Sequence, residues 1–219
     1  DGTLWDHAKA LKNAVEDTCR KYELDPKTFM SCFRTAHEFV WRERLASDLP
    51  IESFRLRRME MTLGKMECEE LCPEEINDHY LKNYLSEPCV MDGAAEAVEA
   101  ARNYGRVAIV TNGPIDTQQA KVAHLGDHSG EIDFLQCADQ GMGLKPQIGF
   151  FQRARRRAGS PRPERIMMVG DTWKEDIVIP HQLGWKTAWI SSGRPFPEGG
   201  IAALGLHHVG ELPSVLERI

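Results

Sequence analysis

The chain has 219 residues, of which 42% are hydrophobic and 27% charged, and its net charge is -6 with a pI of about 5.8. The proportions are typical of a folded globular protein, and the acidic balance argues against a nucleic-acid-binding surface, which is usually basic. No apolar run approaches the roughly 20 residues that a membrane-spanning helix needs. The length suits one large domain, or a core domain that carries a smaller inserted one.

The cysteines do not form a metal-binding pattern. They are Cys19, Cys32, Cys68, Cys72, Cys89 and Cys137. No two of them are spaced as a CxxC pair, and the spacing of Cys68 and Cys72 is not repeated elsewhere, so a zinc site is not predicted. We therefore expect reduced thiols in a cytoplasmic protein.

The first part of the chain, residues 5–90, has a helical pattern throughout. Apolar side chains recur at steps of three and four over residues 8–22, which indicates one buried helix face. Pro26 and Pro73 stand where proline favours the first turn of a helix, and a further helix is indicated over residues 55–66. This part is expected to be an all-helical module.

From about residue 90 onward, short apolar runs alternate with helical stretches. The runs are 106–113 (RVAIVTNG), 132–137 (IDFLQC), 165–171 (RIMMVGD) and 186–191 (KTAWIS). The helical stretches are 94–104, 116–125, 148–158 and 174–183. This alternation predicts an α/β fold with a doubly wound, Rossmann-like parallel sheet. Pro180 falls inside the last helical stretch and should kink it.

The first apolar run of this part ends in Thr111, Asn112 and Gly113. Ligands bind at the carboxyl ends of strands in open parallel sheets. A hydroxyl and exposed backbone amides just before a helix form a place where a phosphate group can bind. The alternative is an ordinary turn in which the threonine and asparagine cap the helix.

Charged side chains lie at or after the ends of two further apolar runs, 132–137 and 165–171. Asp171 and Asp176 lie five residues apart in GDTWKED, and two carboxylates converging there would suit Mg²⁺. Lys145 in GLKPQ would neutralise charge on a phosphate. The alternatives are a helix-capping aspartate, a solvated aspartate and a solvated surface lysine.

Taken together and in this order, these segments resemble the four motifs of the haloacid dehalogenase-like hydrolase superfamily. The matching segments are DGTL (1–4), TNG (111–113), KP (145–146) and GDTWKED (170–176). The resemblance covers nearly the whole chain and implies an α/β core over residues 1–5 and 89–219. Residues 6–88 are then identified as a helical cap of the type 1 class. The chain looks most like members that act on nucleoside monophosphates or acylneuraminate 9-phosphates.

The first motif of that family reads Asp-x-Asp-Gly-Thr-Leu, so Asp1 matches its second aspartate. The resemblance places the nucleophilic aspartate two residues upstream, together with the central first strand of the sheet. We therefore expect this chain to be a fragment that lacks both. Dehalogenating members have tyrosine at the position of Asp1, whereas phosphatases have aspartate because an alkoxide leaving group needs a proton.

The resemblance implies Mg²⁺-dependent hydrolysis of a small-molecule phosphomonoester through an aspartyl-phosphate intermediate. Asp1 and Lys145 would be catalytic, the first as general acid and base. The residues implied for substrate binding are Thr111, Asn112, Gly113 and Lys145, and those implied for the metal are Asp1, Asp171 and Asp176. The expected partner is a phosphate ester, without nucleic acid or membrane, and the chain would be a monomer or homodimer.

Other functions remain open at this point. One is a binding protein that keeps the fold without the nucleophile, and retention of the charged set counts against it. Another is a phosphomutase or a phosphonate-cleaving enzyme, the latter requiring a Schiff-base lysine in the cap. The arginine-rich segment at residues 55–58 (RLRR) either meets an anionic substrate or forms a solvated helix face.

Overall fold

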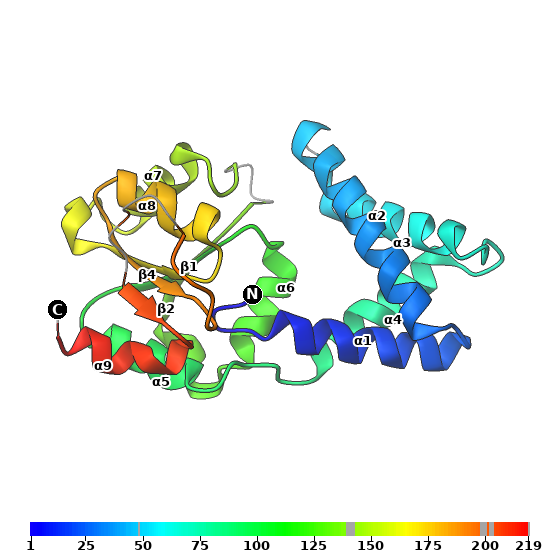
Figure 1. Cartoon of the computed structure of the whole chain (residues 1–219), viewed down its shortest axis with the longest axis horizontal. Helices are drawn as coiled ribbons and strands as arrows, with labels where there is room; N and C mark the ends of the chain where they lie inside the picture. Colours follow the sequence, from blue (N-terminus) through cyan, green and yellow to red (C-terminus); the bar gives the residue numbers. More distant parts are fainter. Residues whose placement is uncertain (48, 139–142, 198–200, 202–203, 219) are drawn as a thin grey trace. The chain divides into compact units, whose positions relative to one another are not determined.

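The computed structural model describes residues 1–47, 49–138, 143–197, 201 and 204–218. The chain divides into two compact units, which Figure 1 draws in the colours of the sequence. The core unit contains Asp1–Asp6 and Cys89–Ile219, and the helical unit contains His7–Pro88. Among the described residues, no helix combines the length and the apolar character that crossing a membrane requires.

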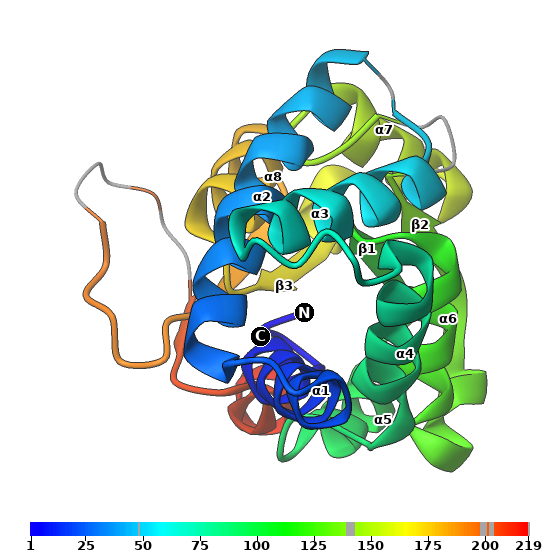
Figure 2. The same ribbon diagram turned by 90° about the vertical axis from the view of Figure 1, so that its right-hand side faces the viewer.

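The helical unit is built from helices packed in pairs. These helices are α1 (His7–Tyr22), α2 (Pro26–Ser47), α3 (Ile51–Lys65) and α4 (Pro73–Ser86). Helix α2 packs against α3, and α1 packs against α4 (Figure 2). Apolar side chains such as Phe29, Val40 and Ile76 are fully buried between them. The third helix begins four residues before the predicted start, directly after Pro50.

The arginine-rich segment of α3 is not a solvated helix face, because Arg55 and Arg58 are buried. The guanidinium of Arg58 lies 4.3 Å from the ring centroid of Phe33 and 5.5 Å from that of Tyr80. Such rings stabilise a buried cation through their negative faces. Burial lowers the pKa of Arg58 and raises the pKa of Tyr80. The solvated alternative is therefore wrong for these two arginines.

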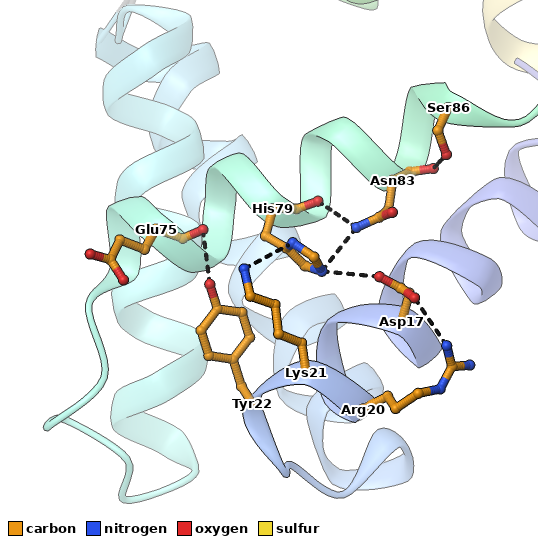
Figure 3. Close-up of polar contacts among 8 residues, drawn as sticks. All are labelled: Asp17, Arg20, Lys21, Tyr22, Glu75, His79, Asn83 and Ser86. Atoms are coloured by element: carbon orange, nitrogen blue, oxygen red, sulfur yellow. Dashed lines mark hydrogen bonds and ion pairs between the residues drawn. The ribbon is translucent and has the colours of Figure 1, made fainter.

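Polar contacts join α1 to α4 around His79 (Figure 3). Its Nε2 lies 3.0 Å from Oδ2 of Asp17, and its Nδ1 lies 3.2 Å from Nζ of Lys21. Asn83, one turn further along α4, donates from Nδ2 to the backbone oxygen of His79. Partly exposed polar pairs of this kind usually contribute little stability, so the packing of α1 against α4 depends mainly on their buried apolar side chains.

The core unit contains parallel strands and the remaining helices. The strands are β1 (Val107–Thr111), β2 (Ile132–Cys137), β3 (Met167–Gly170), β4 (Lys186–Ile190) and β5 (Leu204–Leu206). The α-helices are α5 (Ala94–Arg102), α6 (Ile115–Ala123), α7 (Ile148–Arg157), α8 (Ile179–Gln182) and α9 (Leu212–Leu216). The 3-10 helices are η1 (Gly126–Glu131), η2 (Pro163–Arg165) and η4 (Val209–Glu211), and η3 (Trp173–Val178) is a π-helix. Strand β1 pairs with β2, and β3, β4 and β5 pair in that order, all parallel.

Helices cover both faces of these strands (Figure 1). On one face, α5 and α9 bury Val98 and Leu212 against Ile190 of β4. On the other face, Phe151 of α7 packs with Met168 of β3, and α8 adds side chains beside them. Helices on both sides of a parallel sheet define a doubly wound α/β fold. The predicted fold class is confirmed.

The chain leaves the core unit and returns to it on neighbouring segments. Trp5 and Val90 form an isolated antiparallel bridge. The backbone N–H of Asp6 donates to the oxygen of Cys89 at 2.7 Å, and a second hydrogen bond of 2.9 Å joins Met91 to Leu4. The helical unit is therefore an insertion whose two ends are fixed side by side.

The predicted helix at residues 174–183 is divided in two. Its first part, η3, has the wide turns of a π-helix, and α8 follows with Pro180 at its second position. Proline has no N–H to donate to the preceding turn, so a regular α-helix is interrupted there. Single π-helical turns occur often at functional sites.

Candidate active site

The first residues of the chain form a turn against the end of β3. The backbone N–H of Gly2 donates to the oxygen of Trp5, and the hydroxyl of Thr3 donates to Oδ1 of Asp171 at 3.2 Å. Gly2 has a φ of +70°, and a Cβ added to it would collide with the Asp171 carboxylate. Only glycine lets the backbone beside Asp1 approach this carboxylate so closely.

Gly2→Ala is therefore expected to weaken the site. The left-handed backbone costs about 1 to 2 kcal/mol for a residue with a Cβ, and the Asp171 carboxylate must also move. Urea unfolding measures the expected loss of stability, and calorimetry measures the expected loss of Mg²⁺ affinity at the displaced Asp171 carboxylate. The matched control is Gly105→Ala, since nothing lies within 4 Å of a Cβ added there. Equal behaviour of the two variants would contradict the close-packed turn.

Lys145 and Asp176 form a buried ion pair, with Nζ 2.6 Å from Oδ1. The second carboxylate oxygen of Asp176 accepts a hydrogen bond from the backbone N–H of Thr172 at 3.0 Å. Gly170 lies so close to this carboxylate that a Cβ would collide with it. The peptide bond between Lys145 and Pro146 is cis. Two of the predicted site residues are thus in direct contact.

The side chain of Asn112 holds the backbone of Lys145. Its Oδ1 accepts from the Lys145 N–H at 2.7 Å, and its Nδ2 donates to the Lys145 oxygen at 3.0 Å. The same Nδ2 donates to Oε2 of Glu175 at 3.2 Å. One residue on, the N–H of Gly113 donates to Oγ1 of Thr111 at 3.0 Å. The turn after β1 is thereby joined to the lysine and to η3.

Asp1 pairs with a lysine that the sequence analysis did not select. Nζ of Lys121 on α6 lies 2.5 Å from Oδ1 of Asp1. Burial lowers the pKa of Lys121 to about 7. The charges of Lys121, Asp171, Lys145 and Asp176 all act at the backbone nitrogen of Asp1. All these charged groups therefore gather around Asp1.

Glu175 is a second residue that the sequence analysis missed. Burial raises the pKa of its carboxyl, Lys145 opposes this shift, and the charges of Asp176 and Asp171 add to it. The only available indication was its place inside the GDTWKED segment. For Lys121 the indication was its spacing, because it follows Gln118 by three residues and so lies on the same face of the predicted helix. The side chain of Lys121 is buried, and that of Glu175 is partly buried.

The oxygen donors at Asp171 fit a hard cation such as Mg²⁺. The Asp171 carboxylate is partly exposed, and its backbone oxygen accepts hydrogen bonds from Trp189 and Arg194 at 3.0 and 2.9 Å. In the part of the chain that the structure describes, no cluster of three or more metal-ligating side chains is present. Mg²⁺ commonly uses one or two carboxylates, completed by water and substrate phosphate, so this donor set fits it.

The model of the haloacid dehalogenase-like hydrolases matches residues 1–184, and the chain belongs to this family. It is 30% identical to the pyrimidine 5'-nucleotidase YjjG of Escherichia coli (strain K12) over 146 residues, which are 66% of this chain and 64% of that protein. That match thus spans slightly less than two thirds of the relative. The glyceraldehyde 3-phosphate phosphatase of Pyrococcus furiosus is 26% identical over 231 residues, covering 99% of this chain and 89% of that one.

Solved structures share the fold. The HAD hydrolase YfnB of Bacillus subtilis, bound to magnesium, has a TM-score of 0.82 at 18% identity, covering 99% of this chain and 95% of that chain. A 2-haloacid dehalogenase from Pseudomonas syringae pv. Tomato DC3000 has a TM-score of 0.71 at 22% identity, covering 100% and 95%. The predicted superfamily is confirmed, as is the likeness to nucleotidases and phosphatases.

Proposed function

We propose that this protein is a Mg²⁺-dependent phosphatase that hydrolyses a small-molecule phosphomonoester through an aspartyl-phosphate intermediate. The observation that carries the proposal is the arrangement around Asp1. Two ammonium–carboxylate pairs, Lys121 with Asp1 and Lys145 with Asp176, lie with Asp171 in one charged group. An anionic ester attacked by a carboxylate needs such positive charge beside it. The nucleotidase and phosphatase relatives support the same reaction class.

In this proposal, Asp1 moves protons. In the family motif the nucleophile is the aspartate two positions before the one that Asp1 matches. As that carboxylate attacks phosphorus and the ester P–O bond breaks, Asp1 gives its proton to the leaving oxygen. Asp1 then takes a proton from the water that attacks the aspartyl-phosphate. An aspartate at this position favours ester hydrolysis over dehalogenation, since a halide leaves without a proton.

The remaining residues bind and orient the phosphoryl group. The hydroxyl of Thr111 and the backbone amides of Asn112 and Gly113 would donate to its oxygens, and the Gly113 amide must then exchange its contact with Thr111. Lys145 Nζ would donate to the nucleophile and the phosphoryl oxygens while Asn112 holds its backbone. These contacts fix the phosphorus in line for attack.

The residues proposed to hold Mg²⁺ are the carboxylate of Asp171 and the backbone oxygen of Asp1, with Asp176 binding through water. When bound, the ion neutralises the negative charge of the phosphoryl group. Thr3 keeps the Asp171 carboxylate turned toward the Asp1 turn. The oxygen-only donor set disfavours softer metals.

The test is a panel of phosphate esters with the protein made from its full coding sequence. The panel contains nucleoside 5'-monophosphates, glyceraldehyde 3-phosphate, an acylneuraminate 9-phosphate and p-nitrophenyl phosphate. We expect Mg²⁺ to support release of inorganic phosphate and EDTA to lower the rate about 100-fold or more. Ligand binding without hydrolysis would favour the binding-protein alternative. An isomerised sugar phosphate would indicate a mutase, and a cleaved phosphonate would indicate a phosphonatase.

A further inference from the structure

The buried face of α6 carries polar side chains. Thr117, Gln118 and Lys121 are each less than 10% exposed. Polar side chains therefore occupy the side of the helix that packs inward, where apolar ones are usual. Burial of an ammonium group costs several kcal/mol unless a partner compensates for it. A methionine of similar length would pack there without that cost. Packing alone therefore does not explain a lysine at position 121.

The partner of Lys121 is the carboxylate of Asp1, 2.5 Å away. The ring of Trp5 covers the contact, with its centroid 5.8 Å from Nζ, and Trp5 itself is 3% exposed and lies against His124. Because the Lys121 side chain is buried, the attraction between the two charges is stronger than it would be in water. The Asp1 side chain is 37% exposed, so the ion pair holds a side chain that also meets solvent.

Lys121 contacts one particular carboxylate oxygen of Asp1. Nζ of Lys121 approaches Oδ1 of Asp1. A carboxylate that is held at one oxygen can still carry or accept a proton at the other, here Oδ2. The same aspartate begins the turn that Thr3 joins to Asp171, so its backbone is held from the other side. Backbone and side chain of Asp1 are thus fixed by different elements, the Asp171 segment and α6.

We propose that Lys121 is a positioning residue for phosphoryl transfer, which holds Oδ1 of Asp1 so that Oδ2 faces the leaving oxygen of the substrate. This inference rests on the proposed function, because it assigns Asp1 the proton transfer. The proton on Oδ2 passes to the ester oxygen as the P–O bond breaks. A displacement of about 1 Å at such a group lowers rates about 100-fold, so the orientation matters.

The leaving group of the substrate tests this role. Ethyl phosphate releases a basic alkoxide that needs the proton, whereas p-nitrophenyl phosphate releases a weakly basic phenolate that needs it little. For Lys121→Met we expect kcat/KM on ethyl phosphate to fall about 10- to 100-fold, and on p-nitrophenyl phosphate by less than about 3-fold. Lys121→Arg should recover much of the loss. The control is Lys12→Met, since Lys12 is exposed on α1 and pairs only loosely with Glu16 at 3.8 Å.

Thermal unfolding and magnesium calorimetry accompany the kinetics. If Lys121→Met does not fold, Lys121→Gln replaces it, because glutamine keeps a hydrogen-bond donor without the charge. Equal losses on both esters, or a change in KM alone, would overturn the positioning role and leave a structural lysine. A wild-type protein with no phosphatase activity would instead overturn the proposed function. The two failures are therefore distinguishable.

Discussion

Asparagine in place of Asp171 is expected to lower Mg²⁺-dependent kcat/KM about 100-fold or more. The amide has the shape of the carboxylate but lacks its charge, so it binds the cation far less well. The local structure should persist, because the amide oxygen can still accept the hydrogen bond from Thr3. The backbone oxygen of residue 171 also keeps its contacts with Trp189 and Arg194. Steady-state kinetics over a magnesium titration, with calorimetry of Mg²⁺ binding, measure the effect.

The matched control for Asp171→Asn is Asp127→Asn. It removes the same charge from an exposed aspartate in η1, outside the charged group around Asp1. The control should retain the wild-type rate and magnesium affinity. If Asp171→Asn did the same, the metal role proposed for Asp171 would be wrong. A drop in unfolding temperature without loss of magnesium binding would point to a purely structural role.

Methionine in place of Lys145 is expected to cost about 3 to 5 kcal/mol of stability. It leaves the Asp176 carboxylate, which is 3% exposed, without its cation. The hydrogen bond from the Thr172 N–H remains but does not neutralise the charge. Urea unfolding followed by a probe in the core unit measures the loss. Activity should fall as well, since Lys145 is proposed to contact the phosphoryl group.

A double variant separates stability from activity. Lys145→Met with Asp176→Asn removes both charges while keeping the shape that Gly170 accommodates. We expect most of the stability to return, because no uncompensated charge stays buried, while the activity stays low. Additive losses in the double variant would mean that the two side chains do not interact as the 2.6 Å contact indicates. Recovery of activity would contradict the catalytic role of Lys145.

Much of the core unit was predictable, because its strands are short apolar runs that end in polar residues. The predicted runs 106–113 and 165–171 contain the strands β1 (Val107–Thr111) and β3 (Met167–Gly170). Parallel strands end at one edge of a sheet, and Lys145 and Asp176, which both follow strands, are in contact. Their catalytic and metal-binding roles stay predictions.

Other features depend on contacts that no local pattern contains. Lys121 is 120 residues from Asp1 in the sequence, so neither segment alone indicates that the two side chains pair. Strand β5 has only three residues, too few for a pattern. Pro180 predicted a kink, but no local pattern predicted that the preceding turns widen into the π-helical segment η3. Arg58 is buried because three aromatic rings from α2, α3 and α4 surround it.

The bridge between Trp5 and Val90 marks the point where the inserted helical unit joins the core unit. The chain departs for the helical unit and returns at adjoining points that backbone hydrogen bonds hold together. Every residue proposed for the chemistry comes from the core unit. A different insert joined at the same two points would leave this set intact. The fold thus allows the reaction to be preserved while the inserted module is replaced, lengthened or recombined as a separate cassette.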